Sequence, residues 1–235
     1  MRRTGPLPDR LALCALRFGA VAWGVAERVG IDLVGASEGP PLRSDPEREA
    51  ELDALVQVAL EDGGTIDAAG CPFPAHELLT RLAVGHGLLL HGSNDTSLSV
   101  LEPHPARDFR TELRAVVATD DGVWPLFYAV VARERVDGVF TACLHAGRHR
   151  RYLFATWADP RDASSWTRGA VYAVPRAGFR REWGREWVRA EPVEPALRVL
   201  VRPEDFPLRD EVIAAPTDMR RLPASFRAAK RARAA

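Results

Sequence analysis

The sequence predicts an α+β protein in which a helical N-terminal segment is packed on a mixed β core. Three observations lead to this prediction. Apolar residues recur at helical spacing before residue 85, short apolar runs of strand length follow, and a basic segment comes last. We therefore divide the 235 residues into a helical segment (1–85), a β-rich core (86–210) and a basic C-terminal tail (211–235).

Three helices are predicted in the first segment. The first runs from Asp9 to Val29, because Leu11, Cys14, Phe18, Val21 and Val25 recur three or four residues apart. Residues 35–43, rich in Gly and Pro, are predicted to form a loop. The capping-box signature at 44–47 opens a second helix that ends near Leu60. A third helix is predicted from Pro74 to Val84. Since their apolar faces need cover, we expect these helices to belong to the same compact unit as the core.

The core contains seven short apolar runs that predict strands. They are Gly87–Leu90, Ala115–Ala118, Val139–Leu144, Tyr152–Thr156, Ala170–Val174, Trp187–Ala190 and Leu197–Val201. A helix is predicted after the second strand, with Thr119 or Asp120 as its cap and Pro125 in its first turn. The tail alternates Ala with Arg beyond Arg220, so we expect it to be weakly structured or a short surface helix, with a local positive patch.

Composition narrows the class of protein. Lys and Arg together number 32 and so do Asp and Glu, so no global field attracts the chain to nucleic acid or membrane. Cys14, Cys71 and Cys143 are scattered, without disulfide or metal spacing, which favours a reducing compartment. The start resembles a signal peptide, but Asp9 and Arg17 flank and interrupt its apolar run. We therefore expect a cytoplasmic protein with no membrane span.

His91-Gly92-Ser93 follows the apolar run of residues 88–90 and is the strongest functional signal. A buried strand that ends on these residues presents an imidazole and a hydroxyl at the mouth of a cleft, and both suit a sugar's hydroxyl groups. The glycine admits close approach of a ligand. A second signal follows at 115–131, which predicts a strand, a polar turn and a helix. The alternative for His91 is a satisfied polar group at a strand end.

At these two motifs the chain resembles the ADP-ribosyltransferase superfamily, which includes bacterial toxins, poly-ADP-ribose polymerases and rifampin ADP-ribosyltransferases. The resemblance covers about residues 86–210 and is closest to uncharacterised bacterial proteins. It implies an ADP-ribosyltransferase-like mixed β core and NAD as substrate. It also implies transfer of ADP-ribose to an unknown acceptor, which is a protein, a nucleic acid or a small molecule. A toxin or defence role is the corresponding expectation.

The resemblance also implies roles for particular residues. His91 binds a ribose hydroxyl and takes part in catalysis, while Gly92 or Ser93 lies against the nicotinamide amide. Thr119, in the second motif, is a candidate for binding the cofactor. Nicotinamide leaves through an oxocarbenium-like state that a carboxylate stabilises, and Glu186 matches the late Glu-aromatic-aliphatic strand of the family. The nearby acidic alternatives are Glu182, Glu191 and Glu194.

Two further groups of residues are candidates for contact with the cofactor, an aromatic position and a pair of arginines. Val117 stands where close relatives carry tyrosine, and valine offers no planar ring to stack on nicotinamide. Tyr128 in the following helix is the candidate replacement, with core packing as its alternative. Arg107 and Arg110 are candidates for pyrophosphate, with surface charge as the alternative. We expect His91, Tyr128 and Glu186 to line one cleft.

The departure at Val117 keeps two other functions open. One is a non-catalytic nucleotide-binding or protein-interaction module on the same scaffold. The other is an RNA 2′-phosphotransferase-like enzyme, which would need clustered arginines around a phosphate. His145 and His149 lie four apart, but Gly147 between them favours a polar hairpin loop, so no metal site is predicted.

Overall fold

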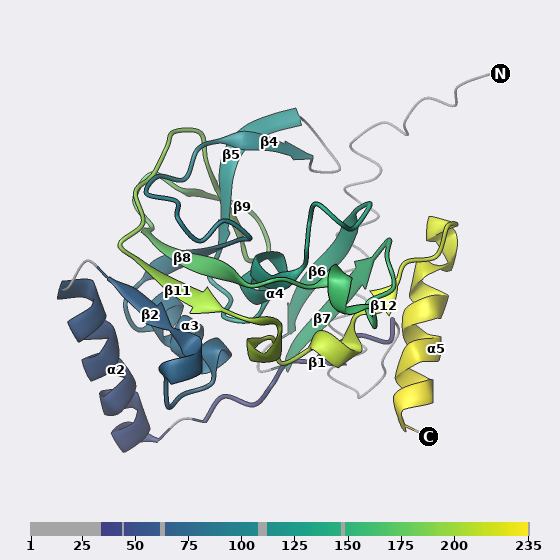
Figure 1. The fold of residues 1–235 in the computed structure, drawn as a ribbon, viewed down its shortest axis with the longest axis horizontal. Helices are drawn as coiled ribbons and strands as arrows, with labels where there is room; N and C mark the ends of the chain where they lie inside the picture. Colours follow the sequence, from purple (N-terminus) through teal and green to yellow (C-terminus); the bar gives the residue numbers. More distant parts are fainter. Residues whose placement is uncertain (1–33, 44, 62–63, 108–111, 147–148, 235) are drawn as a thin grey trace.

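Helices and strands in mixed sheets confirm the predicted α+β class. The structure is a computed structural model that describes residues 34–43, 45–61, 64–107, 112–146 and 149–234 (Figure 1). The first predicted helix, Asp9–Val29, lies outside these residues. All seven predicted strands are present. β3 runs three residues beyond its predicted end at Leu90, so this buried strand ends on the His-Gly-Ser motif.

The larger sheet has the strand order β2-β11-β8-β3-β5-β10-β9. In that order the strands are β2 (Thr65–Asp67), β11 (Leu197–Val201), β8 (Gly169–Pro175), β3 (Leu88–Ser93), β5 (Glu112–Thr119), β10 (Glu186–Arg189) and β9 (Arg180–Trp183). β4 (His104–Arg107) also pairs with β5. β2 and β11 are parallel, and the other pairs are antiparallel.

The smaller sheet is built around β7 (His149–Thr156). β6 (Val139–Ala146) pairs with β7 along its whole length, while β1 (Ser37–Glu38) and β12 (Ile213–Ala214) pair with parts of it. β1 and β2 both come from the segment predicted to be helical. The prediction of a wholly helical segment, with a loop at 35–43, was therefore wrong for the described residues. Since its strands join both sheets, residues 34–85 belong to the same folded unit.

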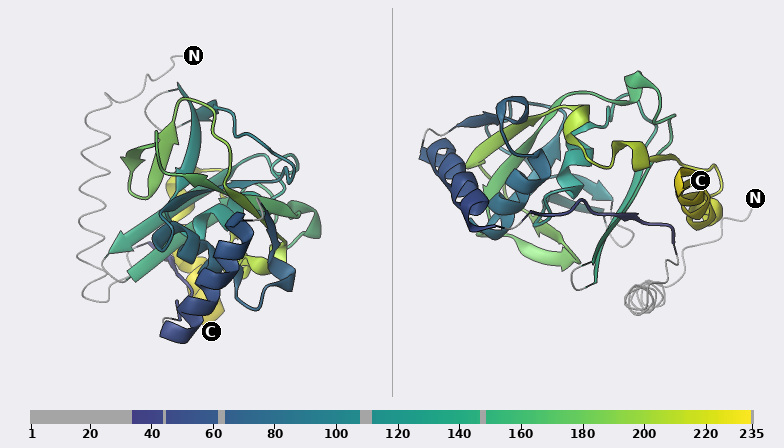
Figure 2. Two further views of the ribbon diagram at one scale, coloured as in Figure 1. Left: turned by 90° about the vertical axis from the view of Figure 1, so that its left-hand side faces the viewer. Right: turned by 90° about the horizontal axis from the view of Figure 1, so that it is seen from below.

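Four α-helices are described: α2 (Pro46–Glu61), α3 (Ala75–Val84), α4 (Trp124–Val130) and α5 (Leu222–Ala234). Short 3-10 turns occur at Ala68–Gly70, Ala163–Ser165, Pro203–Asp205, Arg209–Glu211 and Met219–Arg221. The predicted second and third helices correspond to α2 and α3. α2 and α5 lie at opposite ends of the molecule (Figures 1 and 2). Asp45 caps α2 by accepting the backbone N–H of Arg48 at 3.0 Å.

α4 lies between the two sheets and joins their cores (Figure 1). Leu126, Phe127 and Val130 are fully buried. They share one apolar cluster with Leu90 of the larger sheet and Phe154 of the smaller one. The Phe127 and Phe154 rings are 4.8 Å apart between centroids. This helix therefore fixes the position of one sheet relative to the other.

Gly92 meets the backbone of α4 and not a ligand. A Cβ at this position would lie 2.1 Å from the carbonyl oxygen of Pro125. Gly169 on the neighbouring strand β8 is similar, with a Cβ 2.0 Å from the carbonyl oxygen of Ala129. The expectation that Gly92 admits close approach of a ligand is therefore corrected, because the helix takes up the space that a side chain would need.

The tail forms the helix α5, which is one of its two predicted states. Leu222 and Phe226 are buried in a cluster with Ala36 of the N-terminal segment and Ile213 of β12. These two apolar anchors offset the entropy cost of ordering the basic helix. The tail is thus packed on the smaller sheet.

We expect Gly92→Ala to destabilise the fold by about 3 kcal/mol, because the added methyl group meets backbone atoms that cannot move independently. Urea denaturation would measure the change. Gly70→Ala is the matched control, since a Cβ there has no heavy atom within 4 Å. Equal stability of the two variants would contradict the packing of α4 against β3.

Candidate functional site

The three segments that carry the family resemblance occupy adjacent strands. β3 holds His91-Gly92-Ser93, β5 leads into the second motif, and β10 begins at Glu186. Leu90 of β3 pairs with Thr119 of β5, and Thr119 pairs with Glu186 of β10. Segments almost 100 residues apart in the chain are therefore brought side by side at one end of this part of the sheet.

The register nevertheless divides the predicted side chains between two faces. Thr119 and Glu186 share a row with Leu90, which belongs to the cluster around α4. His91 is the next residue on β3, so its side chain alternates to the opposite face. Ser93 projects to that same opposite face. The expected single cleft, in which His91 and Glu186 face one ribose, is therefore not formed.

His91 is held against the backbone of the neighbouring strand. Its Nδ1 lies 2.7 Å from the carbonyl oxygen of Val117. Burial lowers the pKa of His91, and the positive charge of Arg133 acts in the same direction. The imidazole is therefore neutral at pH 7. The hydroxyl of Ser93 accepts the N–H of Asp95 at 3.2 Å, so it supports the turn after β3.

Tyr128 belongs to α4, the helix that packs on the face of the sheet carrying Glu186. Burial raises the pKa of the Tyr128 phenol, and the nearby carboxylate of Glu186 raises it further. The phenol is neutral and shares a hydrogen bond of 2.8 Å with Oγ1 of Thr141 on β6. Thr119 is buried, and its Oγ1 accepts the N–H of Asp121 at 3.2 Å. Thr119 and Glu186 thus share the face of the sheet on which α4 packs, whereas His91 projects from the opposite face.

Arg107 lies at the other end of β5. It pairs with Glu112, which is seven residues from Thr119 on the same strand. At the usual rise of a strand this separation is roughly 23 Å. Its backbone is therefore far from the row that contains Glu186, and Arg110 lies outside the described residues.

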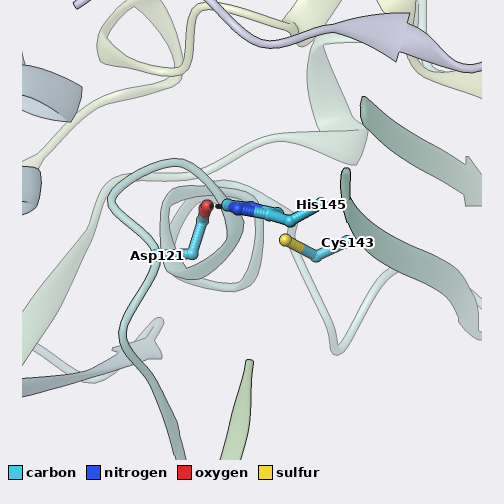
Figure 3. Close-up of side chains that lie close together, drawn as sticks. All are labelled: Asp121, Cys143 and His145. Carbon is cyan, nitrogen blue, oxygen red and sulfur yellow. Dashed lines mark hydrogen bonds and ion pairs between the residues drawn. The ribbon is translucent and has the colours of Figure 1, made fainter. Parts of the chain in front are cut away.

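A second group of side chains meets beside α4. Asp121, Cys143 and His145 each offer one ligand-type atom, and these atoms lie within 4.8 Å of one another (Figure 3). Cys143 and His145 are two residues apart on β6, so they project from the same face of the strand. Asp121 comes from the turn between β5 and α4. We call these three residues the Asp-Cys-His cluster.

Asp121 is the most fully bonded member of this cluster. Its Oδ1 accepts the N–H groups of Val123, the N-cap residue of α4, and of Trp124, its first residue, both at 2.8 Å. The predicted caps, Thr119 and Asp120, do not occupy the N-cap position. Its Oδ2 accepts the Tyr152 hydroxyl at 2.7 Å and lies 3.0 Å from Nε2 of His145. Burial alone would raise the pKa of Asp121. The hydrogen bonds from His145 and Tyr152 outweigh burial, so the pKa falls below its usual value.

The cluster does not present an activated nucleophile. Burial raises the pKa of the Cys143 thiol well above its usual value, and the negative charge of Asp121 adds to the effect. The thiol is therefore protonated at pH 7, whereas nucleophilic catalysis requires thiolate. A carboxylate, a thiol and an imidazole are instead the ligand types that bind zinc and related metals.

Sequence reasoning missed this cluster because it paired His145 with the wrong residue. The region forms a β6–β7 hairpin, as predicted, and Ala146 pairs with His149. His145 and His149 therefore lie on opposite faces of that hairpin. The local signal for the cluster is the Cys-x-His alternation on one strand. Its third member, Asp121, is more than twenty residues earlier in the chain.

Comparison with protein families, with curated proteins and with solved structures finds no match to this chain. None of the helices in the described part of the chain has the length and apolar character needed to cross a membrane. The site must therefore be interpreted from its own residues.

We expect Asp121→Asn to lower the free energy of unfolding by about 3 kcal/mol at pH 7, because the buried partners lose a charged acceptor. The folded-state pKa of Asp121 is depressed, so its contribution is present above the unfolded value of about 3.9 and is lost as pH falls below it. The stability difference from wild type should therefore shrink below about pH 4.

Urea denaturation at several pH values measures this difference. Asp162→Asn is the control, since Asp162 accepts a backbone N–H in a similar turn but is exposed. A difference between wild type and Asp121→Asn that stays constant from pH 7 to pH 3 would contradict the charged state assigned to Asp121.

Proposed function

We propose that this protein transfers ADP-ribose from NAD to an acceptor, with Glu186 and Tyr128 as its principal residues. The observation that carries the proposal is the adjacency of β3, β5 and β10, the three strands that hold the segments resembling the ADP-ribosyltransferase superfamily. The position of Tyr128, in the helix that covers the face carrying Glu186, is a second support, since the reaction needs a ring and a carboxylate together.

In this proposal Glu186 stabilises the positive charge that develops as nicotinamide leaves the ribose. Tyr128 supplies the aromatic surface that Val117 cannot offer. Its phenol stays neutral and is held by Thr141, so the orientation of the ring is fixed before substrate binds. His91 acts from the other face, where its bond to the Val117 carbonyl positions β5 relative to β3.

The second candidate function is a nucleotide-binding or protein-interaction module without catalysis. Two observations favour it: valine at position 117, and the separation of His91 from Glu186 by the register of the sheet. Each removes a contact that the family resemblance implies: the first a ring that stacks on nicotinamide, the second a group that binds its ribose. This module would bind NAD but leave its glycosidic bond intact.

The RNA 2′-phosphotransferase-like function has weaker support. Arg176 and Arg181 lie 4.6 and 6.0 Å from the centre of the Trp187 ring, and Arg185 lies 3.2 Å from Asp120. Asp120 also lies 4.0 Å from Arg176. This carboxylate competes with a phosphate group for the same arginines, so we do not propose this function.

Glu186→Gln should reduce nicotinamide release from NAD about 100-fold, because the amide removes the charge without changing the shape of the side chain. Release is measured with and without cell lysate as a source of acceptor. Glu191→Gln is the control, because Glu191 is an exposed carboxylate after β10 whose ion pair to Arg189 is 3.8 Å long. Equal loss in both variants would argue against a role for Glu186. If NAD raises the melting temperature but the wild-type protein releases no nicotinamide, the non-catalytic binding module replaces the transferase as the proposed function.

Val117→Tyr should raise NAD affinity or nicotinamide release about threefold to tenfold, the value of one aromatic stacking contact. Val117 lies two residues before Thr119 on β5, so a ring at this position projects to the face of Glu186. His91→Ala should lower both quantities by displacing β5. If Val117→Tyr has no effect while Tyr128→Ala abolishes release, Tyr128 already provides the stacking surface.

A further inference from the structure

We propose that Asp121, Cys143 and His145 bind one Zn²⁺ ion beside the N-terminus of α4. The three ligand-type atoms lie within 4.8 Å of one another. Bond lengths of 2.0 to 2.3 Å in a tetrahedral zinc site place ligand atoms about 3.3 to 3.6 Å apart. Side-chain shifts of about 1 Å therefore bring all three atoms into contact with one ion. This inference does not depend on the proposed transferase activity.

The chemical nature of the three ligands favours zinc over other divalent cations. Mg²⁺ and Ca²⁺ prefer oxygen ligands, whereas a thiolate with an imidazole is typical of zinc. Charge balance points the same way. One carboxylate and one thiolate carry two negative charges, which a divalent cation neutralises, and the imidazole binds in its neutral form. Asp121 is buried and the other two ligands are half-buried, so a neutral assembly suits the site better than one with a net charge.

The surroundings of the cluster hold the carboxylate in place. Oδ1 of Asp121 is fixed by two backbone N–H groups of α4, and Oδ2 is bound by the hydroxyl of Tyr152. Gly122 packs so closely on α3 that a Cβ would lie 2.6 Å from the carbonyl oxygen of His76, which fixes the turn. Partners of this kind orient metal ligands and raise affinity.

Zinc binding also changes the state of the thiol. The sulfur exchanges its proton for the metal ion, and the proton is released to solvent. The cation supplies the positive charge that stabilises the thiolate. Three protein ligands leave a fourth position for water.

The test uses the full-length protein after treatment with chelator, with Co²⁺ as a spectroscopic substitute for Zn²⁺. One equivalent of Co²⁺ should give a thiolate charge-transfer band in the near ultraviolet together with the visible bands of a tetrahedral site. Added Zn²⁺ should displace Co²⁺, remove both the charge-transfer band and the visible bands, and raise the melting temperature of the protein. The double variant Cys14→Ser/Cys71→Ser is the matched control, and it should retain the band because Cys143 is its single thiol.

Cys143→Ser should remove the charge-transfer band, and His145→Ala should weaken Co²⁺ binding at least 100-fold. Tyr152→Phe, which leaves the three ligands intact, should weaken it about 10-fold. Far-ultraviolet circular dichroism checks that each variant is folded. Loss of the band in the Cys14→Ser/Cys71→Ser variant would overturn the proposal, as would Co²⁺ affinity unchanged by His145→Ala. A melting temperature that Zn²⁺ does not change would also overturn the proposal, and the cluster would then be a hydrogen-bonded polar network without a metal.

Discussion

The buried carboxylate of Asp121 is the interaction on which the arrangement of the two sheets depends. It accepts two backbone N–H groups at the start of α4 with one oxygen and bonds Tyr152 and His145 of the smaller sheet with the other. A buried charge is tolerated only when its hydrogen bonds are satisfied, so these partners cannot separate without a large cost. One side chain therefore links the strand–turn–helix of β5 and α4 to the hairpin of β6 and β7.

Close packing between backbones also holds α4 in place. Gly92 and Gly169 allow α4 to lie directly on β3 and β8, closer than any residue with a side chain would permit. Phe127 then reaches the smaller sheet and packs on Phe154. The helix is only seven residues long, yet it is the common element of both cores. Its position also decides where Tyr128 lies relative to Glu186.

The transferase proposal and the zinc proposal concern neighbouring groups on the same framework. Thr119 pairs with Glu186 across the sheet, and its hydroxyl accepts the N–H of Asp121. Thr141 holds Tyr128 and lies two residues before Cys143 on β6. The two sites thus share a turn and a strand, but a separate experiment tests each of them. Metal binding is read from Co²⁺ spectra and nucleotide chemistry from nicotinamide release.

The sequence alone determined which segments are helices and strands in most of the described chain, because α2, α3 and the seven apolar runs carry strong local periodicity. It did not predict β1, β2, β4, β9 or β12, since strands of two to four residues have little pattern of their own and exist through pairing with neighbouring strands. It placed the His-Gly-Ser motif on the correct strand.

The face to which each side chain points was decided by the register of β3, β5 and β10, and that register is set by contacts between distant segments. The Asp-Cys-His cluster likewise exists only in the tertiary structure, because the turn before α4 and one face of β6 meet only after both sheets have packed on that helix.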